Sequence, residues 1–336
     1  MSMGARPLSP LTDASVRAAL AMGLDAAPSP RAGQLADFLA RAFGPSTVAL
    51  VHYGSHAYQS DPTSESAHDF FAIVENYGDA YRSLAATVGT RYRPGTAAAL
   101  NHVLPPNVIE VRDQSASPPL VAKVAVFSLG AFQSACSTGT VDHFVRGRLF
   151  QAVQLVWTRD PEWRRAVVSA VVEARAGSFE WGRMFLPRTF DADTYCSCLL
   201  AASFAAEIRP ESRVRISSLL DAQRPIMVPM YAALLQSLAR GAVLDQHGEL
   251  YTNRHATQFW ERLRWAVYFR RSKLRATLRW GKYVALYDDW LDYVVRKIAR
   301  RSGVEIELSP RERRWPLIFL WPKAIRFLRS RPQRQE

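Results

Sequence analysis

A glycine and a serine follow a stretch of apolar, β-branched residues, and an acidic residue comes soon after them. Residues 47–53 predict a buried strand that ends at Gly54 and Ser55, and Asp69 opens a second apolar stretch, residues 69–75. A strand that ends in Gly-Ser can open a tight turn whose N–H groups face a phosphate. A carboxylate at the start of the next strand can hold Mg²⁺ against that phosphate. The pattern predicts a metal-dependent nucleotide site, although an ordinary turn with a solvated aspartate also fits it.

A second metal-binding carboxylate is not evident from spacing alone. The polymerase-beta-type nucleotidyltransferase fold places two acids on this strand with one hydrophobic residue between them, and here Phe71 stands where the second acid would be. Glu75 shares the strand face of Asp69 but lies about 20 Å farther along at ~3.3 Å per residue, too far to share one metal. Three other acids remain candidates for the missing ligand: Asp61, Glu65 and Glu110.

The elements around these residues predict an α+β fold at the front of the chain and a helical part behind it. Apolar residues recur at helical spacing over residues 34–43 and 79–88, and two further strands are expected at 107–111 and 123–127. From Asp142 to about residue 175 the pattern is mostly helical. Residues 188–238 predict helices broken by Pro210, Pro225 and Pro229, and a glycine-containing link is expected over residues 239–252.

The three cysteines favour packing over chemistry. Cys136, Cys196 and Cys198 are too few and too unevenly spaced for a disulfide framework, and no further zinc ligands lie near the last two. A free cysteine usually behaves as a small buried hydrophobic residue. The cysteine content therefore suits a reducing compartment.

Positive charge is concentrated in the last quarter of the chain. Residues 1–252 hold 22 basic and 22 acidic residues, whereas residues 253–336 hold 21 basic and 8 acidic residues and six of the nine tryptophans. An apolar stripe at helical spacing runs from Tyr287 to Ile298, and an apolar run from Trp315 to Trp321 lies between basic clusters. Basic residues mixed with tryptophan suit an anionic membrane surface or nucleic acid, and an inert solvated face is the plainest alternative. The apolar spacing favours the membrane.

Any membrane contact is expected to be peripheral. The first residues lack the compact apolar run of a signal peptide, and residues 1–30 are expected to be poorly ordered. The longest apolar stretches fall short of the roughly 20 residues that span a bilayer.

Several motifs, in order, resemble the mitochondrial-type phosphatidate cytidylyltransferases, the CDP-diacylglycerol synthases also called translocator assembly and maintenance proteins. The first pair is Tyr53-Gly-Ser-His-Ala-Tyr-Gln-Ser-Asp61 with His68-Asp-Phe-Phe-Ala-Ile-Val74, and residues 101–108 resemble the family's short Asn-Pro-containing strand region. The later motifs are Lys123-Val-Ala-Val126, Arg146-Gly-Arg-Leu-Phe-Gln-Ala-Val153 and Glu207-Ile-Arg209-Pro-Glu211, the last followed by Arg213, Arg215 and Gln223. The likeness covers residues 35 to 240 and indicates a divergent bacterial member.

The resemblance implies a nucleotidyltransferase domain over residues 31–178 and a winged-helix-like helical domain over residues 179–252. The charge pattern adds a basic membrane-surface tail over residues 253–336, which has no counterpart in the family pattern. It implies transfer of a cytidylyl group from CTP to phosphatidic acid with Mg²⁺, at the cytoplasmic side of the inner membrane and with no nucleic-acid partner. Asp69 would hold the metal and act in catalysis with Lys123. The residues implied to bind nucleotide are Gly54, Ser55, Arg146 and Arg148, and those implied to face the cleft from the second domain are Glu207, Arg209 and Glu211.

The chain departs from the family pattern at three places. His56 replaces the second glycine of Gly-Ser-Gly, Ala152 or Gln151 replaces a lysine, and Ala206-Glu207 replaces Gly-Asp. Two alternatives therefore stay open. One is an enzyme of the same superfold that acts on RNA or another acceptor, and the other is an inactive membrane scaffold that has kept the fold.

Overall fold

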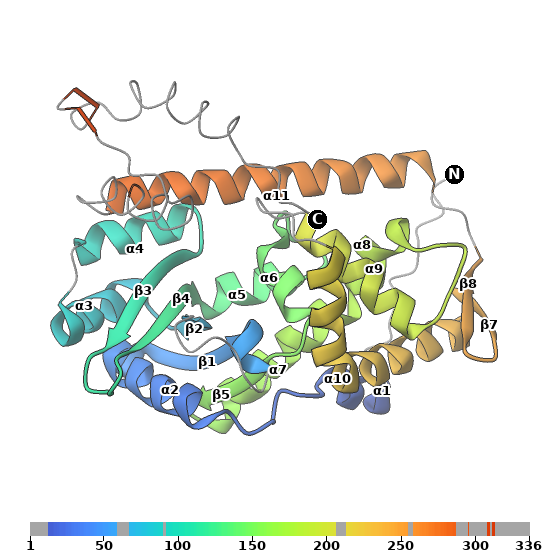
Figure 1. The fold of residues 1–336 in the computed structure, drawn as a ribbon, viewed down its shortest axis with the longest axis horizontal. Coiled ribbons are helices and arrows are strands. Elements are labelled where there is room, and N and C mark those ends of the chain that lie inside the picture. The colour runs from blue at the N-terminus through green and yellow to red at the C-terminus, as the bar shows by residue number, and fades with distance from the viewer. Residues whose placement is uncertain are drawn as a thin grey trace. The chain divides into compact units, whose positions relative to one another are not determined.

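The computed structural model describes residues 13–58, 67–89, 92–205, 213–254 and 258–286, with residues 295, 308–309 and 311–312. The chain forms two compact units, Met1–Trp280 and Gly281–Glu336. The first unit has an α+β fold built on a five-stranded mixed sheet and a smaller three-stranded sheet (Figure 1). The domain boundaries expected near residues 178 and 252 stay predictions.

The first half of this unit alternates helices and strands. Its elements are α1 Ala14–Leu20, α2 Pro30–Phe43, β1 Thr47–Tyr53, the 3-10 turn η3 Ser55–Ala57, β2 His68–Val74, α3 Tyr77–Val88, α4 Pro94–Val103, β3 Asn107–Asp113, β4 Leu120–Ser128, α5 Leu129–Cys136, α6 His143–Leu149 and β5 Gln154–Thr158. A further 3-10 turn, η2 Gly44–Ser46, leads into β1.

The following part is mostly helical. It contains α7 Pro161–Ala176, α8 Ser178–Gly182, the 3-10 turn η4 Arg183–Phe185, β6 Thr189–Phe190, α9 Ala192–Ala205, α10 Arg213–Arg240, β7 Leu244–His247, β8 Leu250–Asn253 and α11 Phe259–Leu286.

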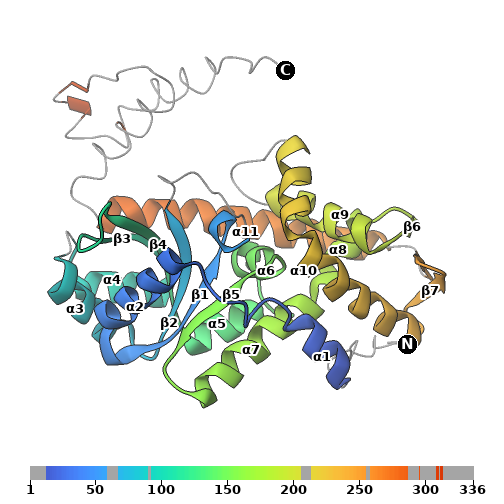
Figure 2. The ribbon, with the colours of Figure 1, turned by 60° about the horizontal axis from the view of Figure 1, so that its bottom comes forward.

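The large sheet has the strand order β3-β4-β2-β1-β5. Only the β2–β4 pair is parallel, and the other neighbours are antiparallel. Every residue of β1 is buried, as its continuous apolar run predicts, because helices cover both faces of the sheet. Helix α2 lies on one face, and α5 and α7 lie on the other (Figure 2).

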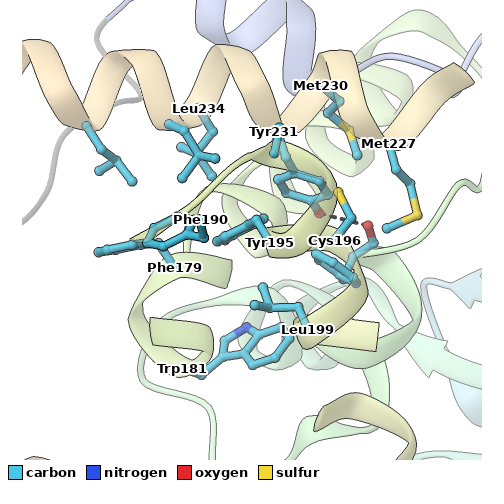
Figure 3. Packing of buried hydrophobic residues seen from close by; sticks show 14 of the residues in the cluster. Phe179, Trp181, Phe190, Tyr195, Cys196, Leu199, Met227, Met230, Tyr231 and Leu234 are labelled. Carbon is cyan, nitrogen blue, oxygen red and sulfur yellow. Dashed lines mark hydrogen bonds between the residues drawn. The ribbon is translucent and has the colours of Figure 1, made fainter. Parts of the chain in front are cut away.

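A second hydrophobic core forms behind the sheet where α8, α9 and α10 meet. Tyr195, Leu199 and Tyr231 are completely buried in it, together with Trp181 (Figure 3). The Tyr231 hydroxyl donates a 2.7 Å hydrogen bond to the carbonyl oxygen of Phe150, which joins α10 to the end of α6. All three cysteines are free, and Cys196 packs in this core, so the packing role predicted for it is confirmed.

Helix α11 packs along several elements of the first unit. The part of this helix up to Trp280 runs past α8, α6 and α4 (Figure 1). Glu261 forms an ion pair with Arg183 near its start, and Arg279 donates to the carbonyl oxygen of Pro105 near the other end of this part. Trp265 and Tyr268 are buried in the second core between these two points.

Two sequence expectations need correction. Residues 13–30, expected to be poorly ordered, include α1, whose Val16 and Leu20 are buried and whose Leu20 carbonyl accepts a 2.7 Å bond from buried Arg175. Helix α10 continues through Pro225 and Pro229 instead of breaking, although Figure 2 shows it change direction partway along. Tertiary packing of its apolar side chains offsets the lost backbone hydrogen bonds.

Some expectations fall outside the described residues. They include the apolar stripe from Tyr287 to Ile298, apart from residue 295, and the run from Trp315 to Trp321. Across the described residues, no helix is both long enough and apolar enough to traverse a bilayer.

Candidate active site

The turn after β1 approaches the first carboxylate of β2 closely. Gly54 has a φ of 82°, a left-handed conformation that favours glycine, and it leads into η3. A Cβ atom at residue 54 would lie 2.9 Å from Oδ2 of Asp69. Glycine is therefore required here on two counts, its backbone conformation and the space that the Asp69 carboxylate occupies.

The sheet places Lys123 beside Asp69. Asp69 pairs with Tyr53 of β1 on one side and with Lys123 of β4 on the other, and Lys123 in turn pairs with Glu110 of β3. Residues paired in register point to the same face of a sheet. Asp69, Lys123 and Glu110 therefore form a row across the sheet next to the Gly54 turn, called here the carboxylate row. The ammonium group of Lys123 lies between the two carboxylate residues in this row.

This row has the donor set for a magnesium ion that is shared with a substrate phosphate. Mg²⁺ is commonly held by one or two carboxylates together with phosphate oxygens and water. The Asp69 carboxylate lies against the turn at the place where such a phosphate would bind, so these residues fit the ion. Among the described residues, no three histidine, cysteine or acidic side chains are grouped to hold a metal without substrate.

Of the three candidates for a second metal-binding carboxylate, the structure describes only Glu110. Glu110 lies in the row but accepts a 2.8 Å hydrogen bond from Nε of Arg112, its neighbour but one along β3. Asp61 and Glu65 lie outside the described residues. The second ligand therefore stays open.

Arg148 lies near the row, on helix α6. Its guanidinium is 4.0 Å from the ring centroid of Phe144 and 5.8 Å from that of Tyr53, the residue that pairs with Asp69. Nη1 of Arg148 also donates to the Phe144 carbonyl oxygen at 2.9 Å. Cation–π contacts of this kind orient a guanidinium, whose planar fork of donors suits a phosphate.

Arg146 points the other way, into the second core. It is completely buried, and its Nη2 donates a 2.8 Å hydrogen bond to the carbonyl oxygen of Gly177. Two residues along a helix differ by about 200° in direction, so Arg146 and Arg148 cannot face the same site. The structure therefore does not bring Arg146 to the Gly54 turn, and its buried position favours a structural role.

Three histidines, His52, His56 and His68, pack together at the turn, on the face of the sheet opposite Asp69. His56 stacks on His68 with ring centroids 4.0 Å apart, and Nδ1 of His68 lies 3.2 Å from Nε2 of His52. Burial lowers the pKa of His52 to about 4, and burial with the charge of neighbouring groups lowers the pKa of His68 to about 3. Both rings are therefore neutral at pH 7 and act as packing and hydrogen-bonding groups.

His56 has a defined packing role in the turn. It stands where the second glycine of Gly-Ser-Gly is expected, and its stacking on His68 replaces glycine's flexibility with a fixed aromatic contact. In the sequence only His52 lies next to the Gly-Ser turn, since His68 follows Ser55 by 13 residues. The contact between His68 and His56 depends on how the turn folds back.

A buried ionic cluster holds α6 against α11. Asp142 caps α6 through the Phe144 N–H at 3.0 Å and receives both terminal nitrogens of Arg279, with Arg275 Nε at 3.2 Å. Burial raises the pKa of Asp142, but the hydrogen bonds and charge of Arg279 outweigh burial and hold it below its ordinary value. Asp142 was recognisable as a helix cap, but its basic partners lie more than 130 residues away.

The cavity next to this cluster is separate from the carboxylate row. It has a volume of about 310 Å³ and is lined by Phe127, Phe144, Arg275 and Arg279 among others. A second cavity of about 370 Å³ lies near α2 and β5. Neither of these two cavities is lined by Asp69 or Lys123.

The second-domain residues expected in the cleft lie outside the described residues. These are Glu207, Arg209 and Glu211. Gln223 of the same segment is described, and its Oε1 accepts the backbone N–H of Ala152 at 2.9 Å. It therefore ties α10 to the segment after α6, where the family motif continues.

No protein-family model and no curated protein matches this chain. The family interpretation consequently depends on the quoted motifs and on the geometry that joins them.

Proposed function

We propose that this protein is a phosphatidate cytidylyltransferase, which uses CTP and a divalent metal to convert phosphatidic acid to CDP-diacylglycerol. The observation that carries the proposal is that the Gly54 turn, Asp69 and Lys123 meet near one end of the inner strands of the sheet. Three separate motifs of the family resemblance supply these residues, and 54 positions separate the last two.

The topology supports a nucleotidyltransferase domain. An antiparallel β1–β2 pair encloses the Gly-Ser turn, and β4 lies parallel to β2 on its other side. Further along the chain β6, α9, α10 and the β7–β8 hairpin follow one another, with the sheet order β6-β8-β7. That order agrees with a winged helix, in which the first strand pairs with the last.

In the proposed reaction a phosphate oxygen of phosphatidic acid attacks the α-phosphorus of CTP. A new phosphorus–oxygen bond forms while the bond from the α-phosphorus to the bridging oxygen breaks, and pyrophosphate leaves with the bonding electrons. The attacking phosphate is already ionised at neutral pH, so no general base is needed. Catalysis of this kind depends on positioning and on neutralising charge.

Each site residue then has a role that its position allows. Asp69 would hold Mg²⁺, which neutralises charge on the triphosphate when bound. Lys123, next to Asp69 in the sheet, would stabilise negative charge on the transferring phosphate. The backbone at Gly54 and the Ser55 hydroxyl would bind the β- and γ-phosphates, and Arg148 would provide a further cation beside Tyr53.

The test measures pyrophosphate and CDP-diacylglycerol formed from CTP, MgCl₂ and vesicles that contain phosphatidic acid. Wild-type protein should form both products, chelation of the metal should abolish them, and Asp69→Asn should lower turnover by at least about 100-fold. Asp79→Asn is the matched control, because Asp79 is an exposed acid on α3 that pairs with Arg82. It should keep wild-type turnover.

Three outcomes contradict the proposal. They are near-normal turnover in Asp69→Asn, no product from wild type, and pyrophosphate release with RNA but not with phosphatidic acid. Nucleotide choice gives a separate check, since CTP should raise the thermal unfolding temperature more than ATP, GTP or UTP. Equal stabilisation by all four nucleotides argues against a cytidylyltransferase.

A further inference from the structure

Helix α11 exposes an apolar stripe on the face opposite its packed side. The stripe consists of Trp260, Leu263, Val267, Leu274 and Leu278, whose exposed fractions are 73%, 44%, 45%, 60% and 53%. Their spacings of three, four, seven and four residues place them on one side of the helix. An aligned row of large exposed apolar side chains differs from isolated surface hydrophobics and indicates an interaction surface.

The opposite face of the same helix is packed into the protein. Trp265, Tyr268, Ser272 and Arg279 are buried, again at helical spacing. Ser272 Oγ accepts the backbone N–H of His143 at 2.9 Å, and Tyr268 lies within 3.3 Å of the His143 ring. Because α11 is held on this side by buried contacts, the apolar stripe is displayed by a fixed helix.

Basic residues flank the stripe on both sides. At 100° per residue, Arg264 and Arg271 fall along one edge of it and Arg270 falls along the other. Arg262 and Lys273 are also exposed farther round. The only acid in residues 259–280 is Glu261, which is half-buried and bound to Arg183, so the exposed charge of this part of the helix is entirely positive.

This combination fits a lipid surface better than a nucleic acid. Phosphate backbones are bound by cations and stacking groups, and a row of exposed leucine and valine adds nothing to such contacts. An interfacial helix, in contrast, inserts aliphatic and tryptophan side chains at the boundary of headgroups and acyl chains, with arginine and lysine at its flanks. The exposed part of α11 has both features.

We propose that the Trp260–Leu278 stripe of α11 docks this protein on an anionic lipid bilayer. The apolar side chains insert below the headgroups, and the flanking arginines bind anionic lipid phosphates. The packed face of the helix connects this surface through Asp142 to α6, which carries Arg148 near the carboxylate row. Docking does not depend on the proposed reaction, so it is tested without CTP or phosphatidic acid.

The experiment is flotation of the full chain with vesicles of phosphatidylcholine and phosphatidylglycerol. The wild type should float, less so as salt rises and little with phosphatidylcholine alone. Leu274→Gln/Leu278→Gln should weaken partitioning by about tenfold or more, because two inserted leucines are lost. Arg270→Gln/Arg271→Gln should weaken it mainly at low salt.

Leu250→Gln is the matched control, since Leu250 is also an exposed leucine, at 47%, and lies in the β7–β8 hairpin outside the stripe. It should float as the wild type does. All the changed side chains are exposed, so the variants should keep the wild-type unfolding temperature, which is measured alongside.

Three results overturn the proposal. The first is equal flotation of wild type and Leu274→Gln/Leu278→Gln, which would mean that another part of the chain covers the stripe or binds the vesicle. The second is retention of an RNA oligonucleotide at physiological salt with no flotation. The third is a dimer that the leucine double variant converts to a monomer, again without flotation.

Discussion

Arg279 of α11 and Asp142 at the start of α6 are 137 positions apart in sequence and form a buried bidentate ion pair. Ser272 and Arg275 of the same helix also reach the Asp142 carboxylate. The most basic helix among the described residues is therefore part of the folded core on this side. Part of the positive charge of α11 therefore stabilises the fold, and only the remainder is available to bind a partner.

Removing either partner of this pair should destabilise the protein strongly. Asp142→Asn and Arg279→Met should each lower the free energy of unfolding by about 3 kcal/mol, because each leaves a buried charge without its partner. The double variant should lose less than the two single losses combined. Denaturant unfolding of all three measures this, with Glu75→Gln as control, since its partly exposed pair with Arg159 should contribute less than about 1 kcal/mol. Additive losses would show that the two residues do not act together.

Gly54→Ala should damage activity more than its backbone conformation alone explains. The new Cβ would meet Asp69 Oδ2 at 2.9 Å and displace the carboxylate, in addition to straining a φ of 82°. Gly89→Ala is the control, because Gly89 has a φ of 65° but a Cβ added there would meet no atom within 4 Å. Both should lose about 1 kcal/mol of stability from backbone strain, and only Gly54→Ala should lose about tenfold or more in pyrophosphate release. Equal pyrophosphate release in the two variants would show that the Gly54 turn is not part of the active site.

Gly177→Ala tests the packing of Arg146. Gly177 has an ordinary backbone conformation, but an added Cβ would lie 2.4 Å from Nη2 of buried Arg146. The substitution should lower the free energy of unfolding by about 1–3 kcal/mol through overpacking. In an Arg146→Met background the same substitution should cost less, because the methionine side chain has no rigid guanidinium at that place. If Gly177→Ala lowers the free energy of unfolding by the same amount in the Arg146→Met background, atoms other than the Arg146 guanidinium clash with the new Cβ.

Arg146→Met alone separates a structural role from nucleotide binding. The buried position predicts a loss of stability with a KM for CTP within about twofold of wild type. Steady-state kinetics at a temperature where the variant is folded, together with denaturant unfolding, measure both effects. A KM raised more than about tenfold with unchanged stability would restore the nucleotide-binding role that the family motif implies.

The buried histidines should make stability depend on pH on the acid side of neutrality. The pKa values of His52 and His68 fall from the ordinary 6.5 to about 4 and about 3 in the folded protein, chiefly through burial. The unfolded chain therefore binds more protons between about pH 4 and pH 6.5, and stability is lost as the pH falls through that window. His52→Phe should reduce the slope of stability against pH. Thermal unfolding of the wild type and the variant from pH 5 to pH 8 measures this, and identical slopes would contradict it.

Much of the site could be predicted because its parts are local. The apolar run of residues 47–53 matches β1 residue for residue, and the strand that begins near Asp69 is β2, shifted by one residue. A two-residue period and a Gly-Ser turn are properties of neighbouring residues, so they can be read without knowing the rest of the fold. Strand β5 was missed because its five residues lie within a stretch of helical character.

The sequence by itself determined the α+β class, the Gly54 turn, the position of Asp69 at the start of its strand and the excess of positive charge after residue 252. Only the tertiary structure decided that Lys123 lies beside Asp69, because that contact needs β2 and β4 to pair in parallel across an intervening helix pair and hairpin. It also decided that Arg148 lies beside Tyr53 while Arg146 is buried, and that Arg279 neutralises Asp142 instead of facing solvent. Local patterns specify turns and periodicity, whereas the side of a helix or the neighbour of a strand depends on packing between segments that are distant in the chain.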